Sequence, residues 1–302
     1  MSTNNNSKKK EFLINFAAGG VSAVISKSAN APVERIKLLL QTQDANLDII
    51  KSGRRYTGIT DCFKRVIKEE GVRAFWKGNF PNILRYFPTQ ALNFAFKDTY
   101  KNFFKTTDKD ASFSRKFLGN LLAGGCAGAT SLAFIYPLDF ARQRLGVDIS
   151  GQFKGLTNCL STTLKSDGRN GLYRGFGVSV LGIFFYRAAY FGLYDTAKTF
   201  MGNNVLVNFV VAFTTTIASG LAAYPLDSIR RRLMMQSGRA EADIQYTGAV
   251  DCFKKVLQQE GFKGFYKGCL INVMSGLAAS LMLVSYDQIK AGSKNGRKGG
   301  DK

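Results

Sequence analysis

Long apolar stretches separated by charged segments are the first pattern along the chain. Three stretches contain no Asp, Glu, Lys or Arg, and a shorter apolar run ends before Lys27: the stretches cover 117–138, 203–226 and 269–286, and the run covers 12–26. A helix needs about 20 mostly apolar residues to cross the roughly 30 Å hydrocarbon core of a bilayer. The pattern therefore predicts membrane helices, and buried helices of a soluble protein are the weaker alternative.

Three apolar runs end in a proline that is followed by an acidic and a basic residue. The segments read APVERIK at 31–37, YPLDFARQR at 136–144 and YPLDSIR at 224–230. Proline interrupts the helical hydrogen-bond ladder, so Pro32, Pro137 and Pro225 are expected to kink the helices. The acid and the base lie three residues apart and share one helix face. A costly arrangement that occurs three times indicates one shared mechanism.

The chain consists of three repeats. Four short elements recur at intervals of 97 and 93 residues. They are Tyr56-Thr57-Gly58, Phe153-Lys154-Gly155 and Tyr246-Thr247-Gly248; Glu70-Gly71, Asp167-Gly168 and Glu260-Gly261; Trp76-Lys77-Gly78, Tyr173-Arg174-Gly175 and Tyr266-Lys267-Gly268; and Cys62, Cys159 and Cys252. Elements that keep register in this way indicate copies of one structural unit. We expect repeats at 10–110, 112–202 and 203–296, with disordered termini at 1–9 and 297–302.

Each repeat predicts a long helix, a short amphipathic helix and a second long helix. The segment TDCFKRVIKEEG at 60–71 is an example of the short helix, with Cys62, Phe63, Val66 and Ile67 on one face. Only helices and closed barrels satisfy the backbone in lipid, and these periods are helical. The expected fold is an all-α membrane protein of three tandem repeats, with six transmembrane helices in a pseudo-threefold, barrel-like bundle and three short amphipathic helices.

The repeated charged pairs predict two gates. In a threefold bundle, the acid of one odd-numbered helix can meet the base of the next and close a ring at one end of a central cavity. The residues of this ring are Glu34, Lys37, Asp139, Arg142, Asp227 and Arg230. A second set, on the even-numbered helices, would close the other end: Asp98, Lys101, Asp195, Lys198, Asp287 and Lys290. Each exposed pair contributes about 1 kcal/mol or less, so a ring can close and reopen. Ordinary helix-end ion pairs are the alternative.

Composition narrows the function classes. The net charge is +21, which first suggests nucleic acid or an anionic membrane surface, but the charges alternate with apolar stretches. The chain has no histidine, which disfavours an enzyme, and its five cysteines show no metal-like clustering, so we expect free thiols and no metal site. The N-terminal MSTNNNSKKKEF resembles neither a secretory signal nor an Arg-rich transit peptide.

These motifs resemble the mitochondrial carrier family over nearly the whole chain. The Pro-x-acid-x-x-base, acid-Gly and aromatic-basic-Gly elements carry the resemblance, and RRRLMM at 230–235, RYFPTQALNFAFKD at 85–98 and YRAAYFGLYDTAK at 186–198 resemble its ADP/ATP carrier branch. The resemblance implies a multi-pass antiporter of the mitochondrial inner membrane, most simply a monomer, that alternates access through two salt-bridge gates. It places the Pro-x-acid-x-x-base gate on the matrix side.

The resemblance also implies bound cardiolipin as the one structural cofactor. The lipid phosphates would meet backbone amides at helix N-termini on the matrix side. The elements concerned are Tyr56, Gly58, Trp76, Gly78, Phe153, Gly155, Tyr173, Gly175, Tyr246, Gly248, Tyr266 and Gly268.

The repeats differ where a substrate should bind, near the middle of the bilayer. The seventh residue beyond Gly78, Gly175 and Gly268 is Arg85, Gly182 and Ser275 respectively. Arg85 suits phosphate, and Gly182 leaves a slot for an adenine. The predicted substrate residues are Lys27, Arg85, Gly182, Ile183, Tyr186, Arg187 and Ser275, with Tyr190 and Tyr194 one and two turns beyond Tyr186. The resemblance to ADP/ATP carriers implies an arginine followed by glycine at this third position. Ser275, followed by Gly276, departs from that pattern.

Three hypotheses follow. The first is exchange of ADP for ATP or a related nucleotide. The second is a carrier of the same fold with a changed substrate. The third is a carrier-like structural subunit of a larger respiratory assembly in the inner membrane. Intact gates favour the first two hypotheses, and the missing arginine favours the second and third. Nucleic-acid binding and soluble catalysis explain neither the predicted spans nor the gates.

Overall fold

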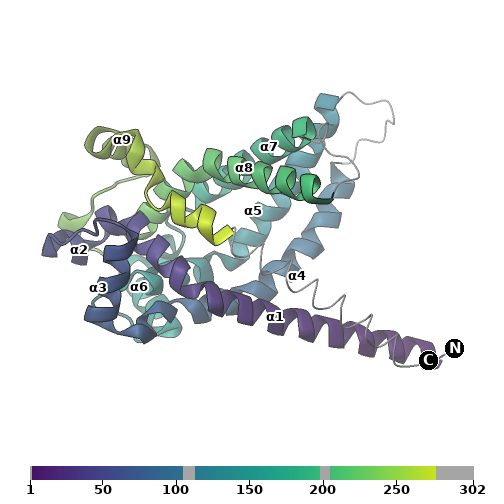
Figure 1. Ribbon diagram of the computed structural model, residues 1–302, viewed down its shortest axis with the longest axis horizontal. Coiled ribbons are helices and arrows are strands. Elements are labelled where there is room, and N and C mark those ends of the chain that lie inside the picture. Colours follow the sequence, from purple (N-terminus) through teal and green to yellow (C-terminus); the bar gives the residue numbers. More distant parts are fainter. Residues whose placement is uncertain (1, 105–112, 198–204, 277–302) are drawn as a thin grey trace.

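The computed structural model describes residues 2–104, 113–197 and 205–276, and helices account for all the regular secondary structure in these ranges (Figure 1). The long helices are α1 (Ser2–Thr42), α4 (Asn79–Phe103), α5 (Phe113–Gly146), α7 (Phe176–Ala197) and α8 (Val205–Met234), and a further helix is described over 269–276. The shorter helices are α2 (Leu47–Ser52), α3 (Ile59–Glu70), α6 (Leu156–Leu172) and α9 (Ala249–Glu260). The predicted all-α architecture is confirmed.

The shorter helices gather at one end of the molecule, and the long helices extend from there (Figure 1). We call this end the short-helix end. Helices α1, α5 and α8 carry Pro32, Pro137 and Pro225 inside them and continue beyond each proline to Thr42, Gly146 and Met234. The gate residues therefore lie on the last turns of these helices, next to the short-helix end.

Three helices in the described part are long and apolar enough to cross a membrane. They cover Phe117–Gly146, Phe176–Tyr194 and Val207–Met234, each with a mean hydropathy of 1.5. Helices α1 and α4 carry Lys27 and Arg85 within their length, and such polar residues reduce the mean hydropathy of a helix. The sixth predicted span begins at Cys269 and is described only as far as Gly276.

Helix α1 begins at Ser2, within the segment 1–9 that we expected to be disordered. Extending an existing helix adds one hydrogen bond per residue without a new nucleation step, so a polar segment can continue it. The C-terminal segment 297–302, also expected to be disordered, lies outside the described residues.

The apolar face of the short helix α3 is divided between two environments. Cys62 and Val66 are buried, whereas Phe63 and Ile67 are 42% and 39% exposed. The four residues share one face of α3, as expected, and this face is wide enough for one half to pack inward while the other half faces outward. Phe63 stacks on Phe75 with 5.0 Å between ring centroids. The outward half of α3 is suited to the membrane interface.

Candidate functional site

The ends of α1, α5 and α8 bring the predicted gate residues of the short-helix end together. Glu34 on α1 forms an ion pair with Arg142 on α5, and Asp139 on α5 forms one with Arg230 on α8. Both pairs join the acid of one helix to the base of the next. The Asp139 side chain is 6% exposed, so its charge depends on these contacts.

The third expected pair, between Lys37 and Asp227, does not form within 4 Å in the described structure. Arg231, one turn after Asp227 on the same helix, donates to its carboxylate at 2.7 Å, and Gln41 donates to it at 3.2 Å. The Lys37 ammonium instead donates to the amide oxygen of Asn272 at 2.5 Å. Arg231, the i,i+4 neighbour of Asp227, thus replaces Lys37 as its ionic partner. The ring therefore contains two interhelical ion pairs, and its third junction is made by hydrogen bonds that involve the neutral side chains of Gln41 and Asn272.

Two residues of α4 reach into the gate from the central side. Arg85, expected to bind substrate, donates to Asp139 with 2.6 Å between Nη1 and Oδ1. Asn82 donates to the carboxylate of Glu34 at 3.3 Å. The Asp139 carboxylate therefore pairs with two arginines, Arg85 of α4 and Arg230 of α8. From the sequence we expected Arg85 to bind substrate and Asp139 to form the gate, as separate sites. In the structure these two side chains are in direct contact.

The aromatic-basic-Gly elements pack directly against the backbone of the gate. Gly78, Gly175 and Gly268 have φ values of 79°, 82° and 78°, which favour glycine. A Cβ atom at these positions would lie 2.8, 3.0 and 3.2 Å from the carbonyl oxygens of Arg142, Arg230 and Lys37 respectively. Each glycine therefore lets the start of the second long helix of its repeat approach the basic gate residue of the next repeat.

A cavity of about 460 Å³ is lined by four of the seven predicted substrate residues, and we call it the central cavity. Gly182, Ile183, Tyr186 and Arg187 line it, together with Asp227 and Arg230 of the gate. A Cβ atom at Gly182 would meet only Leu226, at 3.8 Å, so the wall is open there. The cavity thus reaches from the gate to an apolar slot.

Aromatic rings continue along α7 from the central cavity. The ring of Tyr190 lies 6.1 Å from Tyr186 and 5.7 Å from Tyr194, and both pairs are stacked. Arg187 lies against Gly124, where a Cβ atom would come within 2.6 Å of its guanidinium. The small residue on α5 therefore gives Arg187 room to lie between the helices.

Lys27 and Ser275 are engaged with other protein groups. The Lys27 ammonium lies 5.4 Å from the ring centroid of Tyr86. The Asn30 amide donates to the Ser275 hydroxyl at 2.7 Å, and both residues line a second cavity of about 470 Å³. We did not predict Asn30 from the sequence. A signal for it existed, since the residues two positions before Pro137 and Pro225 are the apolar Ile135 and Ala223, whereas Asn30 is polar.

The second predicted gate lies mostly outside the described residues. Asp98 and Lys101 are exposed near the end of α4, away from the short helices, and neither forms an ion pair with the described part of the chain. The side chain of Asp195 and residues Lys198, Asp287 and Lys290 are not described.

The elements expected to bind cardiolipin lie at helix N-termini of the short-helix end. Gly58, Gly155 and Gly248 precede α3, α6 and α9, and Gly78 precedes α4. A cavity of about 670 Å³ is lined by the starts of α7 and α9, including Gly175 and Gly248. Tyr56 and Tyr246 are buried, whereas Trp76 is 43% exposed. Free backbone amides at helix N-termini are suited to anions.

Comparison with known proteins agrees with this architecture. A family model described as mitochondrial carrier protein matches residues 8–108, 113–205 and 202–296. ADP/ATP translocase 3 of Homo sapiens is 54% identical over 289 residues, which cover 92% of this chain and 97% of that protein. ADP/ATP translocase 2 of Tachyglossus aculeatus aculeatus and of Rattus norvegicus are each 53% identical with the same coverage. With three matched repeats and relatives aligned over almost their whole length, this chain belongs to the mitochondrial carrier family.

Proposed function

We propose that this chain exchanges ADP for ATP across the mitochondrial inner membrane, as a transporter and not as an enzyme. The observation that supports this proposal most strongly is the sequence identity of 53–54% with ADP/ATP translocases over 97% of their length. The central cavity supports the proposal, because it offers a slot at Gly182, tyrosine rings and arginine side chains within one volume. Aromatic rings suit a base, and arginines suit phosphates.

Alternating access would operate through the ion pairs of the short-helix end. In this proposal, the ion pairs Glu34–Arg142 and Asp139–Arg230 would form the closed state of the matrix gate. A nucleotide phosphate entering from the other side would compete with Asp139 for Arg85. Since Asp139 lies within 2.6 Å of Arg85, losing that partner would weaken the gate beside it. Substrate binding would thus favour opening because the ligand and the gate share one arginine.

The Asn30–Ser275 contact distinguishes this chain's site from one with a third arginine. A neutral amide–hydroxyl hydrogen bond replaces a charge that could hold phosphate. A charge-assisted hydrogen bond contributes about 1.5–3 kcal/mol. We therefore propose weaker nucleotide binding than in a carrier with arginine there, most of all for the more highly charged ATP.

Cardiolipin is the proposed lipid partner of the short-helix end. The support is threefold repetition of glycine-preceded helix starts and a cavity of about 670 Å³ between two of them. Oriented N–H groups at these starts would bind the lipid phosphates.

The test is reconstitution of the purified chain into liposomes with a panel of labelled nucleotides. The proposal predicts exchange of ADP and ATP in preference to guanine and pyrimidine nucleotides. Exchange of another anion only would establish a changed substrate. No exchange, together with co-purification of the chain with a respiratory complex in mild detergent, would establish a structural role.

A further inference from the structure

A separate polar cavity lies at the short-helix end, beyond the gate. The loops that follow α1, α5 and α8 all line it, and its volume is about 330 Å³; we call it the loop cavity. Its lining includes Asp48, Lys51, Arg144, Asp148 and Arg239. On each helix these residues follow the gate residues in sequence, so the loop cavity lies on the far side of the gate from the central cavity.

Arg144 is a buried cation without a carboxylate partner. It is 8% exposed, and it has no acid within 4 Å in the described residues. Its guanidinium lies 5.3 Å from the ring centroid of Phe153 and donates to the Met235 carbonyl at 3.3 Å, while its Nε has no hydrogen-bond partner there. A buried charge with so little compensation is unfavourable unless a ligand completes it.

The third repeat shows what Arg144 lacks. Arg232 occupies the same place, seven residues after the repeat proline, and its guanidinium pairs with Glu260 at 2.8 Å. The counterpart of Glu260 in the second repeat is Asp167, whose side chain is one methylene shorter. Asp167 pairs with Arg174 at 3.6 Å and accepts from the backbone of Gly238 at 2.9 Å. The acid that would satisfy Arg144 is therefore engaged elsewhere.

Arg239 adds a second cation to the same cavity. It donates to the Gln236 side chain at 3.2 Å and to the Asp243 carbonyl at 3.3 Å, and also to the Ala45 carbonyl. Burial and the neighbouring charge of Arg144 lower the pKa of Arg239 to about 10. Two arginines that repel each other beside one cavity favour the entry of an anion.

The acidic residues of the loop cavity do not neutralise these arginines. The carboxylate of Asp148 accepts the backbone N–H groups of Gln152 and Phe153, each at 3.0 Å, and so caps its own loop. Asp48 is exposed to solvent. Lys51, also exposed, is already paired with Asp243 at 3.3 Å.

We propose that the loop cavity binds a phosphate-bearing anion from the aqueous phase through Arg144 and Arg239. Guanidinium groups match phosphate oxygens in pairs, and 330 Å³ exceeds the volume of several waters, at about 30 Å³ each. A soluble anion fits better than a lipid headgroup, because loops of all three repeats line the cavity beyond the ends of the long helices. The inference holds whichever substrate the central cavity carries.

The test measures the binding of inorganic pyrophosphate to the purified full chain in detergent, by calorimetry and thermal unfolding. We expect pyrophosphate to raise the unfolding temperature at constant ionic strength. In Arg239→Gln the dissociation constant should rise at least tenfold, and in Arg144→Gln likewise, with partial recovery in Arg144→Lys. Arg239 is half-buried at the surface, so its variant remains informative if Arg144→Gln fails to fold.

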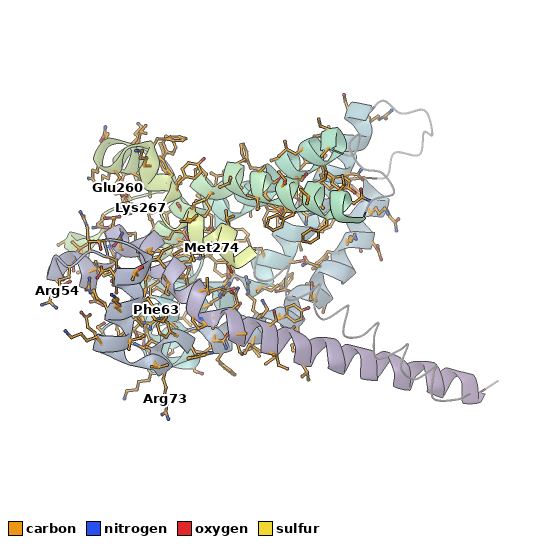
Figure 2. The ribbon with its side chains drawn as sticks, viewed as in Figure 1. Arg54, Phe63, Arg73, Glu260, Lys267 and Met274 are labelled. Carbon is orange, nitrogen blue, oxygen red and sulfur yellow. The ribbon has the colours of Figure 1, made fainter. Side chains whose placement is uncertain are left out.

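Two matched controls separate this site from other cations. Arg73 is exposed at the same end (Figure 2), and Arg73→Gln should leave pyrophosphate binding unchanged. Arg85→Gln, which removes the contact with Asp139 on the other side of the gate, should also preserve it. The proposal is overturned if Arg239→Gln binds pyrophosphate as the unmodified chain does, if Arg85→Gln alone removes binding, or if potassium chloride produces the same shift. It is also overturned if Arg239→Gln weakens stabilisation by cardiolipin vesicles and not by pyrophosphate.

Discussion

Asp139→Asn is the sharpest perturbation of the gate, because one carboxylate serves two cations. Oδ1 of Asp139 lies 2.6 Å from Arg85, and Oδ2 pairs with Arg230. Asparagine keeps one acceptor oxygen, while its amide N–H₂ faces the other guanidinium. Both arginines then lose a charged partner, and one loses its acceptor.

The magnitude follows from the burial of the three side chains. Removing one member of a buried ion pair costs about 3–5 kcal/mol. The side chains of Arg85 and Arg230 are 26% and 21% exposed, so solvent screens part of that loss. We take about 2–3 kcal/mol, which for a chain of this length corresponds to a fall of about 3–5 °C in the unfolding temperature.

The assay combines thermal unfolding in detergent with nucleotide exchange in liposomes. Asp139→Asn should lower the unfolding temperature and abolish exchange, since the closed state would lose its gate. Glu241→Gln, an exposed acid without an ion pair in the described structure, is the matched control and should change neither. Unaltered stability and exchange in Asp139→Asn would refute the gate.

Charge-swapped pairs provide a finer test of the same contacts. Exchanging the charges of Asp139 and Arg230 would place a new cation against Arg85, so this swap should restore little exchange. Exchanging those of Glu34 and Arg142 should restore more, because the other direct contact of Glu34 is the neutral Asn82. Equal recovery in both swaps would contradict the role of Arg85 at Asp139.

Four further predictions test the remaining contacts. Ser275→Arg should raise ATP uptake in proteoliposomes by tenfold or more, as expected for one charge-assisted hydrogen bond of about 1.5–3 kcal/mol; unchanged uptake would show that this position does not limit binding. Gly175→Ala should destabilise the protein by about 1–3 kcal/mol, because Gly175 has a positive φ and lies close to the Arg230 carbonyl. Gly177→Ala in α7, where a Cβ atom meets open space, should stabilise the protein by about 0.5–1 kcal/mol. Equal shifts of the unfolding temperature in the two variants would contradict this difference. Cardiolipin should raise the unfolding temperature more than a neutral lipid, and an equal effect of both lipids would exclude a specific site. Burial raises the pKa of the Cys62 thiol to about 12, so at pH 8 it stays protonated and should react with maleimide far more slowly in the folded protein than after unfolding in denaturant; equal rates would show that α3 opens readily.

The repeated elements explain why the architecture was predictable from the sequence. Glycines with positive φ, such as Gly78, need a specific residue at a fixed place, so three copies leave a visible period. The apolar runs of α5, α7 and α8 are long enough to indicate spans directly. Both signals are local, and local signals survive in a linear pattern.

Contacts decided by competition between partners were not predictable. Asp227 pairs with Arg231 on its own helix because that base is close in every conformation of α8, while Lys37 finds Asn272. The Arg85–Asp139 contact depends on the angle between α4 and α5, which no spacing encodes. The Asn30–Ser275 bond joins the first repeat to the third, and only the comparison of equivalent positions hints at it.

Counter-exchange in liposomes tests the central claim most directly. The purified chain is reconstituted into cardiolipin-containing liposomes, and the uptake of labelled ADP is followed with ATP inside or with no nucleotide inside. Alternating access between the central cavity and a closable gate predicts rapid uptake only into ATP-loaded liposomes, and none with Asp139→Asn. Equal uptake into loaded and empty liposomes, or none in either with correctly inserted protein, would contradict nucleotide exchange by this chain.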